Sequence, residues 1–376
     1  KHFANISILI SMLLLWKVFL FLHFKTFDLT EFNSLQIKSI KKETEKSVSI
    51  VFNIPEILES KYKFKAGQYI TLKADVKGKQ VVRSYSICSA PSSSELKIGV
   101  KAIPNGLFSN YALNDLNEGD SLGVSPPMGR FIIENANLEN IFMGIAAGSG
   151  VTPILSIIYD ALESNKDSRF ILLYGNKSKN ETMFSKEIHH LEQSYKDRFY
   201  YHKIFSQENN SDSKFGRIDS SFIKFCIKKH PKLKIDKFLI CGPEKLTIES
   251  VETLKSLGYN EKDILFELFY SEEKDNSEQD QKVDKITAKI TCDFEDFEIA
   301  VPKDMTILDA ALENNIDIPY SCQGGVCSSC IGKITAGSAK MAINNVLSDN
   351  EISEGLTLAC QAIPTSENIS IDFDDV

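Results

Sequence analysis

Apolar and polar positions alternate in short runs from residue 32 onward, with turn residues between the runs. Alternation with a period of two places successive side chains on opposite faces of a strand. Because no long helical pattern separates these runs, they predict an antiparallel Greek-key β-barrel of about 100 residues. The predicted strands include residues 47–53, 68–74, 81–88, 96–102 and 121–124.

The pattern changes at residue 140, where apolar strands begin to alternate with amphipathic helical stretches. Strand–helix alternation of this kind predicts an α/β domain built on a doubly wound parallel sheet. The predicted strands are residues 141–146, 170–174, 199–205, 238–241 and 264–269. The predicted helices are residues 153–163, 184–195 and 244–257.

A strongly polar stretch separates this α/β domain from the rest of the chain. It has almost no apolar side chain and cannot contribute to a core, so it is predicted to be a linker. The predicted boundaries are 1–31 for an apolar N-terminal segment, 32–136 for the barrel, 137–270 for the α/β domain, 271–285 for the linker and 286–376 for a third compact domain.

The N-terminal segment is almost unbroken apolar sequence at residues 6–24. That length approaches the 18–20 or so residues of a spanning helix, but Lys17 lies inside the run, where burial in a bilayer is costly. No small-residue cleavage site follows, which disfavours a signal peptide. Three interpretations remain open: a misassigned start, a membrane anchor and a helix lying in the membrane interface.

Composition narrows the class of protein further. The 376 residues are 43% hydrophobic and 25% charged, which excludes a disordered chain and a polytopic membrane protein. The formal charge of −8 shows no basic excess and argues against a nucleic-acid partner. Residues 286–376 hold four Lys or Arg and fifteen Asp or Glu, a net of −11, which leaves +3 for the other 285 residues. The third domain is therefore strongly acidic.

Four cysteines near the C-terminus have a regular spacing. Cys322, Cys327 and Cys330 form C-x4-C-x2-C, and Cys360 follows after 29 intervening residues. This is the spacing of plant-type [2Fe–2S] sites, in which glycines let the loop fold around the cluster. Zinc sites prefer paired C-x2-C units, and only one such pair is present here. The sequence therefore predicts a [2Fe–2S] cluster with these four ligands, in a reducing compartment.

A glycine-rich turn follows the first strand of the α/β domain and opens a helix. It contains Gly148 and Gly150 and ends at Pro153, which suits the first helical turn. Glycines at this position let the backbone approach a pyrophosphate, whose charge is favoured at the helix N-terminus. A bare tight turn is the alternative, because the loop matches neither the G-x-G-x-x-G fingerprint nor a Walker loop.

These segments together resemble a known family. RSYS at residues 83–86, a glycine and serine at 106 and 109, IAAGSGVTPIL at 145–155 and CGP at 241–243 occur in the order seen in ferredoxin–NADP reductase-like flavoproteins. With PYSCQGGVCSSC at residues 319–330, the chain resembles oxygenase reductases that carry a C-terminal plant-type ferredoxin domain. More narrowly, it is similar to the reductase subunits of phenylacetyl-CoA epoxidases. The resemblance implies a flavin-binding barrel, an NAD(P)-binding domain and an α+β ferredoxin β-grasp.

The resemblance also implies roles for individual residues. Arg83 would pair with the flavin pyrophosphate, Tyr85 would pack on the flavin, and Ser86 would hydrogen-bond near its N5 atom. Cys241 would lie near the nicotinamide, and Glu267 would border the flavin. Ser86, Cys241 and Glu267 are thus the candidate catalytic residues. The further candidate cofactor-binding residues are Lys101, Gly106, Ser109, Gly148, Gly150, Thr152, Lys177, Arg217, Gly242, Pro243 and Phe269.

The choice of nicotinamide cofactor depends on the adenosine ribose. Loops that select NADH usually supply an acidic residue after the second strand, and here that strand ends in Tyr-Gly-Asn-Lys177 with no acid. Lys177, Ser206 and Arg217 are available to a 2′-phosphate, which favours NADPH over NADH. The identity of the flavin as FAD comes from the resemblance alone.

The predicted function is an NAD(P)H-dependent oxidoreductase that passes electrons singly from FAD through the [2Fe–2S] cluster to a separate, di-iron oxygenase. Phenylacetyl-CoA epoxidase is the preferred partner, and the acidic ferredoxin domain would dock on a basic patch there. The alternatives are a reductase for a membrane-bound desaturase or hydroxylase, a ferredoxin-type carrier without NAD(P)H turnover, and a diaphorase. The predicted location is cytoplasmic, with membrane contact only through residues 6–24.

Overall fold

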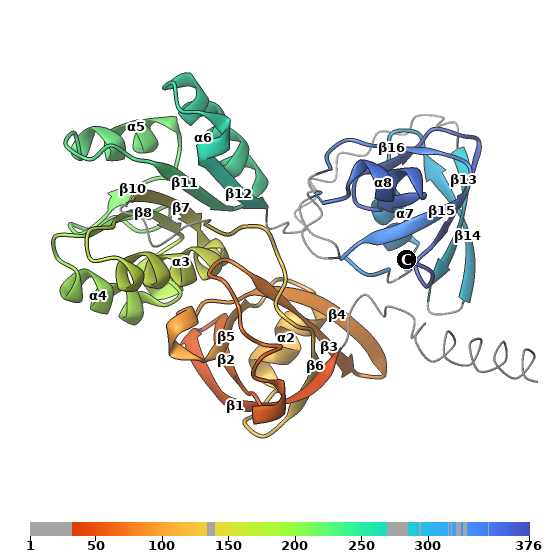
Figure 1. The fold of residues 1–376 in the computed structure, drawn as a ribbon, viewed down its shortest axis with the longest axis horizontal. Coiled ribbons are helices and arrows are strands. Elements are labelled where there is room, and N and C mark those ends of the chain that lie inside the picture. The colour runs from red at the N-terminus through yellow and green to blue at the C-terminus, as the bar shows by residue number, and fades with distance from the viewer. Residues whose placement is uncertain are drawn as a thin grey trace, which may run out of the picture.

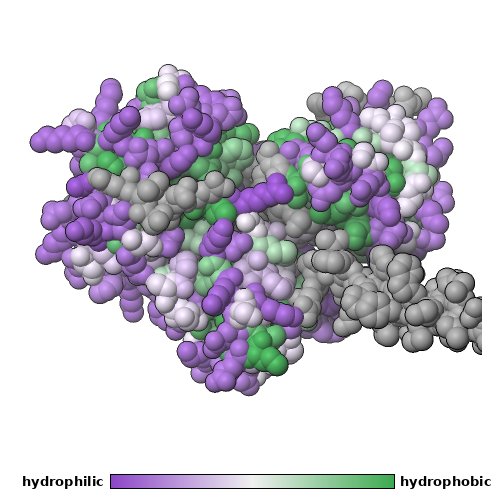
Figure 2. Space-filling view, in the orientation of Figure 1, coloured by the Kyte–Doolittle hydropathy of each residue, from purple (hydrophilic) through white to green (hydrophobic). Residues whose placement is uncertain are grey.

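The structure, a computed structural model, describes residues 32–133, 140–268, 285–292, 295–314, 316, 318–320, 325, 329–344 and 346–376. Three sheet-based domains follow one another along the chain (Figure 1). Hydrophilic side chains cover most of the visible surface of the first two domains (Figure 2). The predicted N-terminal segment and residues 271–284 of the predicted linker lie outside the described residues, whereas Lys285, predicted to end the linker, begins β13. Within the described ranges, no helix combines the length and apolar character needed to cross a bilayer.

The first domain is a six-stranded antiparallel barrel with the strand order β4-β3-β6-β1-β2-β5. A bridge between Ile87 and Ile98 joins the chain after β4 to β5 and closes the barrel. Helix α2 packs against the barrel through the buried Phe108. The elements are β1 (Asn33–Thr44), β2 (Ser47–Asn53), η1 (Glu56–Leu58), β3 (Tyr69–Val76), β4 (Lys79–Ser86), η2 (Pro91–Ser93), β5 (Leu96–Lys101), α2 (Leu107–Asn114) and β6 (Ser121–Val124).

The second domain is a parallel sheet with the order β10-β9-β8-β7-β11-β12. Apolar residues of α3 and α4 pack on one face of the sheet and those of α5 and α6 on the other, which makes it doubly wound. Its elements are β7 (Ile141–Ala147), η3 (Gly148–Gly150), α3 (Val151–Ser164), β8 (Arg169–Asn176), η4 (Lys179–Glu181), α4 (Ser185–Ser194), β9 (Phe199–Phe205), β10 (Lys214–Phe215), α5 (Ser220–Lys229), β11 (Lys237–Gly242), α6 (Glu244–Ser256), η5 (Glu261–Asp263) and β12 (Ile264–Leu268).

The third domain is a mixed five-stranded sheet with the order β14-β13-β19-β15-β17, and α7 packs on it. Only the β13–β19 pair is parallel among its described pairings, as expected for a β-grasp. The elements are β13 (Lys285–Cys292), β14 (Glu295–Pro302), α7 (Ile307–Glu313), β15 (Ile331–Ala336), β16 (Ala339–Met341), α8 (Asp349–Ser353), β17 (Leu356–Leu358), β18 (Ala362–Pro364) and β19 (Asn368–Asp372).

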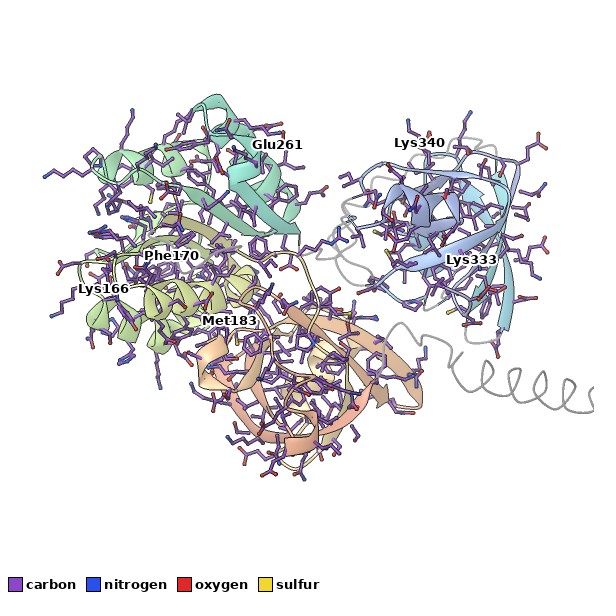
Figure 3. The ribbon with its side chains drawn as sticks, viewed as in Figure 1. Lys166, Phe170, Met183, Glu261, Lys333 and Lys340 are labelled. Atoms are coloured by element: carbon purple, nitrogen blue, oxygen red, sulfur yellow. The ribbon has the colours of Figure 1, made fainter. Side chains whose placement is uncertain are left out.

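The barrel and the parallel sheet share part of one hydrophobic core. Ala66, Cys88 and Phe131 of the first domain belong to the same buried cluster as Phe170 and Met183 of the second (Figure 3). The Ser156 hydroxyl of α3 donates a buried hydrogen bond of 2.7 Å to the carbonyl of Ser89. This packing fixes the carboxyl edge of the parallel sheet against the barrel, where the candidate site lies.

Candidate nucleotide, flavin and cluster sites

The glycine-rich loop lies at the point where the strand order of the parallel sheet reverses. β8 lies on one side of β7 and β11 on the other, so the loops after β7 and β11 diverge to opposite faces of the sheet. Gly150 comes so close to β11 that a Cβ atom on it would overlap the carbonyl of Cys241. Open α/β sheets bind their ligands in the crevice at this switch point. The position of the loop therefore suits the predicted nucleotide-binding turn, and its role stays a prediction.

Hydrogen bonds hold the glycine-rich loop in shape. The Tyr174 hydroxyl donates to the Gly148 carbonyl at 2.8 Å, and the Thr152 hydroxyl donates to the Ser149 carbonyl at 2.9 Å. Gly148 has a φ of 56°, which favours glycine because its left-handed conformation crowds a Cβ atom. The turn is thus fixed before any ligand binds.

The barrel contributes a cation to the same loop. The Lys101 ammonium lies 3.7 Å from the position that a Cβ on Gly148 would occupy, and 3.9 Å from the Glu181 carboxylate. Burial lowers the pKa of Lys101, and Lys177 and Lys46 lower it further, while Glu181 opposes the shift. A desolvated ammonium beside a glycine-rich turn and a helix N-terminus suits an anionic group such as a pyrophosphate.

Asn176, at the carboxyl end of β8, was not a predicted site residue. Its side chain is 8% exposed, and neither its amide nitrogen nor its amide oxygen has a hydrogen-bond partner among the described residues. A buried amide without partners indicates a polar ligand or water. Lys177 follows directly, and the Ser206 backbone N–H donates to the Asn176 carbonyl at 2.9 Å. Lys177 and Arg217 are both exposed on this edge of the domain.

Cys241 and Glu267 lie side by side on the neighbouring strands β11 and β12. Both are buried, and burial raises the pKa of the Cys241 thiol well above its usual value, with the Glu267 charge adding to the shift. The thiol is therefore neutral at physiological pH. Gly242 follows, and Pro243 is the residue before α6. The structure thus places Glu267, predicted to border the flavin, beside Cys241 and Gly242, predicted near the nicotinamide. Phe269, the other residue predicted to border the flavin, lies outside the described residues.

The predicted flavin residues lie on β4 and at the start of α2. Tyr85 packs on Phe108 with 5.4 Å between ring centroids, and Ser86 is buried at the end of the strand. Gly106 precedes α2, where a Cβ would lie 2.5 Å from the Ser109 hydroxyl oxygen. That oxygen accepts a hydrogen bond from the Ile103 N–H at 3.3 Å, so Ser109 shapes the turn before the helix.

Arg83 is engaged differently from its predicted role. Its guanidinium lies over the ring of Tyr320 in the third domain, 4.7 Å from the centroid, and its Nη1 donates to the Val82 carbonyl at 2.8 Å. Neither Tyr320 nor any contact between domains could be read from the sequence. The pairing of Arg83 with a pyrophosphate stays a prediction.

Two of the four predicted cluster ligands, Cys330 and Cys360, lie in the described part of the chain. Both are buried, and the Ala359 N–H donates to the Cys330 carbonyl at 2.8 Å, which holds the two segments together. Gly325 has a φ of 70°, and a Cβ on it would crowd the Ile343 carbonyl, so the loop needs glycine here. Cys322 and Cys327 lie outside the described residues. Cys360 lies in the turn that follows β17, which ends at Leu358.

Three parts of the chain match models of known protein families. Residues 34–133 match the oxidoreductase FAD-binding domain family, residues 145–253 the oxidoreductase NAD-binding domain family, and residues 290–365 the 2Fe-2S iron-sulfur cluster binding domain family.

The chain also matches known proteins over nearly their whole length. The chain is 36% identical to a component of the 1,2-phenylacetyl-CoA epoxidase of Escherichia coli, over 92% of this chain and 99% of that one. It is 29% identical to the ferredoxin reductase component of 3-ketosteroid-9-alpha-monooxygenase from Mycolicibacterium smegmatis, over 91% and 97% of the two chains. The solved structure of phthalate dioxygenase reductase has the same fold, with a TM-score of 0.57, 23% identity and coverage of 91% and 98%. The chain therefore belongs to the family of NAD(P)H-dependent oxygenase reductases with an FAD-binding barrel, an NAD-binding domain and a C-terminal [2Fe–2S] ferredoxin domain.

Proposed function

We propose that this reductase oxidises NADPH and delivers the electrons singly to a separate di-iron oxygenase acting on an aryl-CoA ester, with phenylacetyl-CoA as the preferred substrate. The observation that carries this proposal is the 36% identity to the E. coli epoxidase component over nearly its whole length. A ketosteroid oxygenase is the second candidate partner, because of the 29% identity to the M. smegmatis reductase component.

The residues of the crevice would position the nicotinamide. FAD, when bound, accepts a hydride and releases electrons one at a time. The close approach of Gly150 to Cys241 leaves the end of β11 free of obstructing side chains from the glycine-rich loop. Cys241 would present a neutral thiol, and Glu267 would supply the adjacent carboxyl group. Ser86 would serve as a hydrogen-bond partner for the flavin at the end of β4.

NADPH is favoured over NADH by the chemistry at the end of β8. A 2′-phosphate needs cations and hydrogen-bond donors, and Lys177, Arg217 and Ser206 belong to this edge of the sheet. The unpartnered Asn176 amide adds a donor and an acceptor nearby. No acidic side chain occupies the position after β8 that would select the 2′-hydroxyl of NADH.

The acidic ferredoxin domain would dock on a basic surface of the oxygenase. Its net charge of −11, from four basic and fifteen acidic residues, would speed association at low ionic strength. None of the six cysteines described by the structure forms a disulfide. This supports the proposed cytoplasmic location, where thiols stay reduced.

An anaerobic titration tests the electron path. The purified holoprotein is titrated with NADPH and separately with NADH while flavin and cluster absorbance are recorded. We expect flavin bleaching followed by loss of the cluster bands, at lower concentrations of NADPH than of NADH. Cluster absorbance without flavin, or flavin that neither nucleotide reduces, would leave only the ferredoxin-type carrier.

A coupling assay tests the partner. The reduced protein is mixed with a purified phenylacetyl-CoA epoxidase oxygenase component, or with a ketosteroid oxygenase component, each with its own substrate. We expect product only with the first. Product only with the ketosteroid oxygenase would make that oxygenase the partner instead of the epoxidase. Dye reduction without either product would favour a diaphorase.

A further inference from the structure

Within the described parts of the chain, three contacts between the flavin-binding barrel and the ferredoxin domain stand out. The Arg83 guanidinium lies over the Tyr320 ring, the hydroxyls of Ser84 and Ser329 are 3.4 Å apart, and Arg130 Nη2 donates to the Val346 carbonyl at 2.9 Å. Strand β4, which carries the first two, lies on the side of the barrel that faces the ferredoxin domain (Figure 1).

These contacts lie next to both redox motifs. Ser84 is the residue before Tyr85, within the predicted flavin motif, and Ser329 is the residue before the cluster ligand Cys330. A contact between the two serines therefore brings the edge of the flavin site against the edge of the cluster loop. A docking surface elsewhere on the barrel would not align the two motifs in this way.

The chemistry of the contacts explains a feature of the composition. Arg83 and Arg130 are the only arginines between residues 32 and 133, where every other basic residue is lysine. Arginine stacks on aromatic rings and donates in a fixed plane, whereas lysine is a flexible point charge. Both arginines of the barrel contact the ferredoxin domain. Arg83 stacks on an aromatic ring, and Arg130 donates from a planar guanidinium, and lysine does each of these less well.

Charge complements these contacts. Arg130 lies close enough to α8 for its charge to lower the pKa of Glu351, after the larger effect of the Ser348 hydrogen bonds. Asp349 and Glu354 add two more carboxylates at this helix. An exposed pairing of this kind weakens as salt rises.

We propose that Arg83, Ser84 and Arg130 form an internal docking surface for the ferredoxin domain, and that Arg130 is a positioning residue for electron transfer from flavin to cluster. The inference rests on the proposed electron path. In that step one electron leaves the reduced flavin and reduces one ferric ion of the cluster, and no bond forms or breaks. Arg130 acts only by holding the two domains at the distance that this step requires.

Stopped-flow kinetics under anaerobic conditions test the role of Arg130. In Arg130→Ala holoprotein we expect NADPH to reduce the flavin at the wild-type rate, while cluster reduction slows by about three- to tenfold, as the loss of one charged hydrogen bond implies. Arg130→Lys should recover part of the rate, because lysine can still donate to the Val346 carbonyl. The matched control is Arg169→Ala, since Arg169 Nη1 donates at 3.4 Å to the Asp167 carbonyl within its own domain.

Small-angle X-ray scattering provides a readout that does not depend on turnover. The Arg130→Ala chain should have a larger radius of gyration than wild type at low salt, and the difference should shrink at high salt, where both undock. Equal cluster-reduction rates in the Arg130→Ala and Arg169→Ala variants, or equal scattering, would overturn the docking surface. If NADPH does not reduce the flavin of the wild-type protein, the proposed function is wrong. The scattering comparison then still tests the docking surface by itself.

Discussion

At the scale of single residues, the shape of the predicted nucleotide site at the ends of β7 and β11 depends on glycines, which have no side chain. Gly150 approaches the Cys241 carbonyl more closely than any Cβ allows, and a Cβ on Gly242 would lie 3.0 Å from Leu246. The sequence marks these positions only as glycines near a strand end. The partner of Gly150, Cys241, lies about 90 residues away in the chain and is brought close by the pairing of β7 with β11.

Replacing Gly150 with alanine tests this close approach. The added methyl group should push the loop from β11 and raise the KM for NADPH by about tenfold or more, because the displaced loop and helix N-terminus would hold the pyrophosphate less well. Steady-state dye reduction measures the effect. The control is Gly258→Ala, since Gly258 has a φ of 88° and nothing within 4 Å of a Cβ, so it should lower stability by about 1 kcal/mol and leave the KM unchanged. An unchanged KM in Gly150→Ala would contradict the structure.

The Cys241 thiol should be chemically inert in the folded protein. Its pKa is raised well above the ordinary range by burial, so almost no thiolate exists at neutral or mildly alkaline pH. Iodoacetamide at about pH 8 should therefore leave Cys241 unmodified in the native protein and alkylate it in urea, as peptide mass spectrometry would show. Alkylation of the native protein at the rate seen in urea would contradict this environment.

At the scale of elements, local pattern located most strands and helices of the first two domains. The predicted strands 47–53, 121–124 and 199–205 coincide with β2, β6 and β9, and the other predicted strands match within a few residues. β1, β10 and α5 were not predicted. β10 has two exposed residues, so it carries no alternation, and it exists because it pairs with β9.

The packing of β9 against the end of α5 contains a histidine pair. His202 Nε2 and His230 Nε2 are 2.8 Å apart, with the Tyr200 ring 4.6 Å from His230 and Lys229 nearby. Burial, with smaller contributions from the Lys229 and His230 charges, lowers the pKa of His202 to about 4. Burial and Lys229 also lower the pKa of His230. Such histidines are neutral in the folded protein.

This pair makes stability depend on pH. The folded-state pKa of His202 is below its unfolded value of 6.5, so its stabilising contribution is present above pH 6.5 and is lost as pH falls toward about 4. The free energy of unfolding of wild type should therefore fall more between about pH 7.5 and pH 5 than that of His202→Asn. The difference between the two falls should be about 1 kcal/mol after solvent screening. Urea unfolding measures this difference. The control is His190→Asn, at an exposed position on α4, whose free energy of unfolding should fall by as much as that of wild type over the same pH range.

At the scale of the whole molecule, three domains divide the chemistry between them. The barrel and the NAD-binding domain share a core, whereas Arg83, Ser84 and Arg130 of the barrel contact described residues of the ferredoxin domain through polar and aromatic groups. The first interface would hold a bound nicotinamide and flavin in a fixed geometry. The second is small enough to be altered by a single substitution.

Removal of the cluster should separate the two halves of the reaction. In Cys360→Ser, loss of one buried thiolate ligand should abolish the cluster absorbance and lower cytochrome c reduction at least about tenfold, while NADPH–ferricyanide activity at the flavin persists. Cys292→Ser, at a buried cysteine of the same domain outside the predicted ligand set, should keep both activities. Loss of ferricyanide activity in Cys360→Ser would show that the domains are not functionally separate.

The sequence by itself determined the domain types and the chemistry that each can hold. Hydrophobic periodicity is local, so it identified the barrel strands and the strand–helix alternation, and the cysteine spacing identified the cluster loop. Only the tertiary structure decided which distant residues meet. The approach of Gly150 to Cys241, the unpartnered amide of Asn176 and the stacking of Arg83 on Tyr320 follow from strand order and domain packing, which no local pattern encodes.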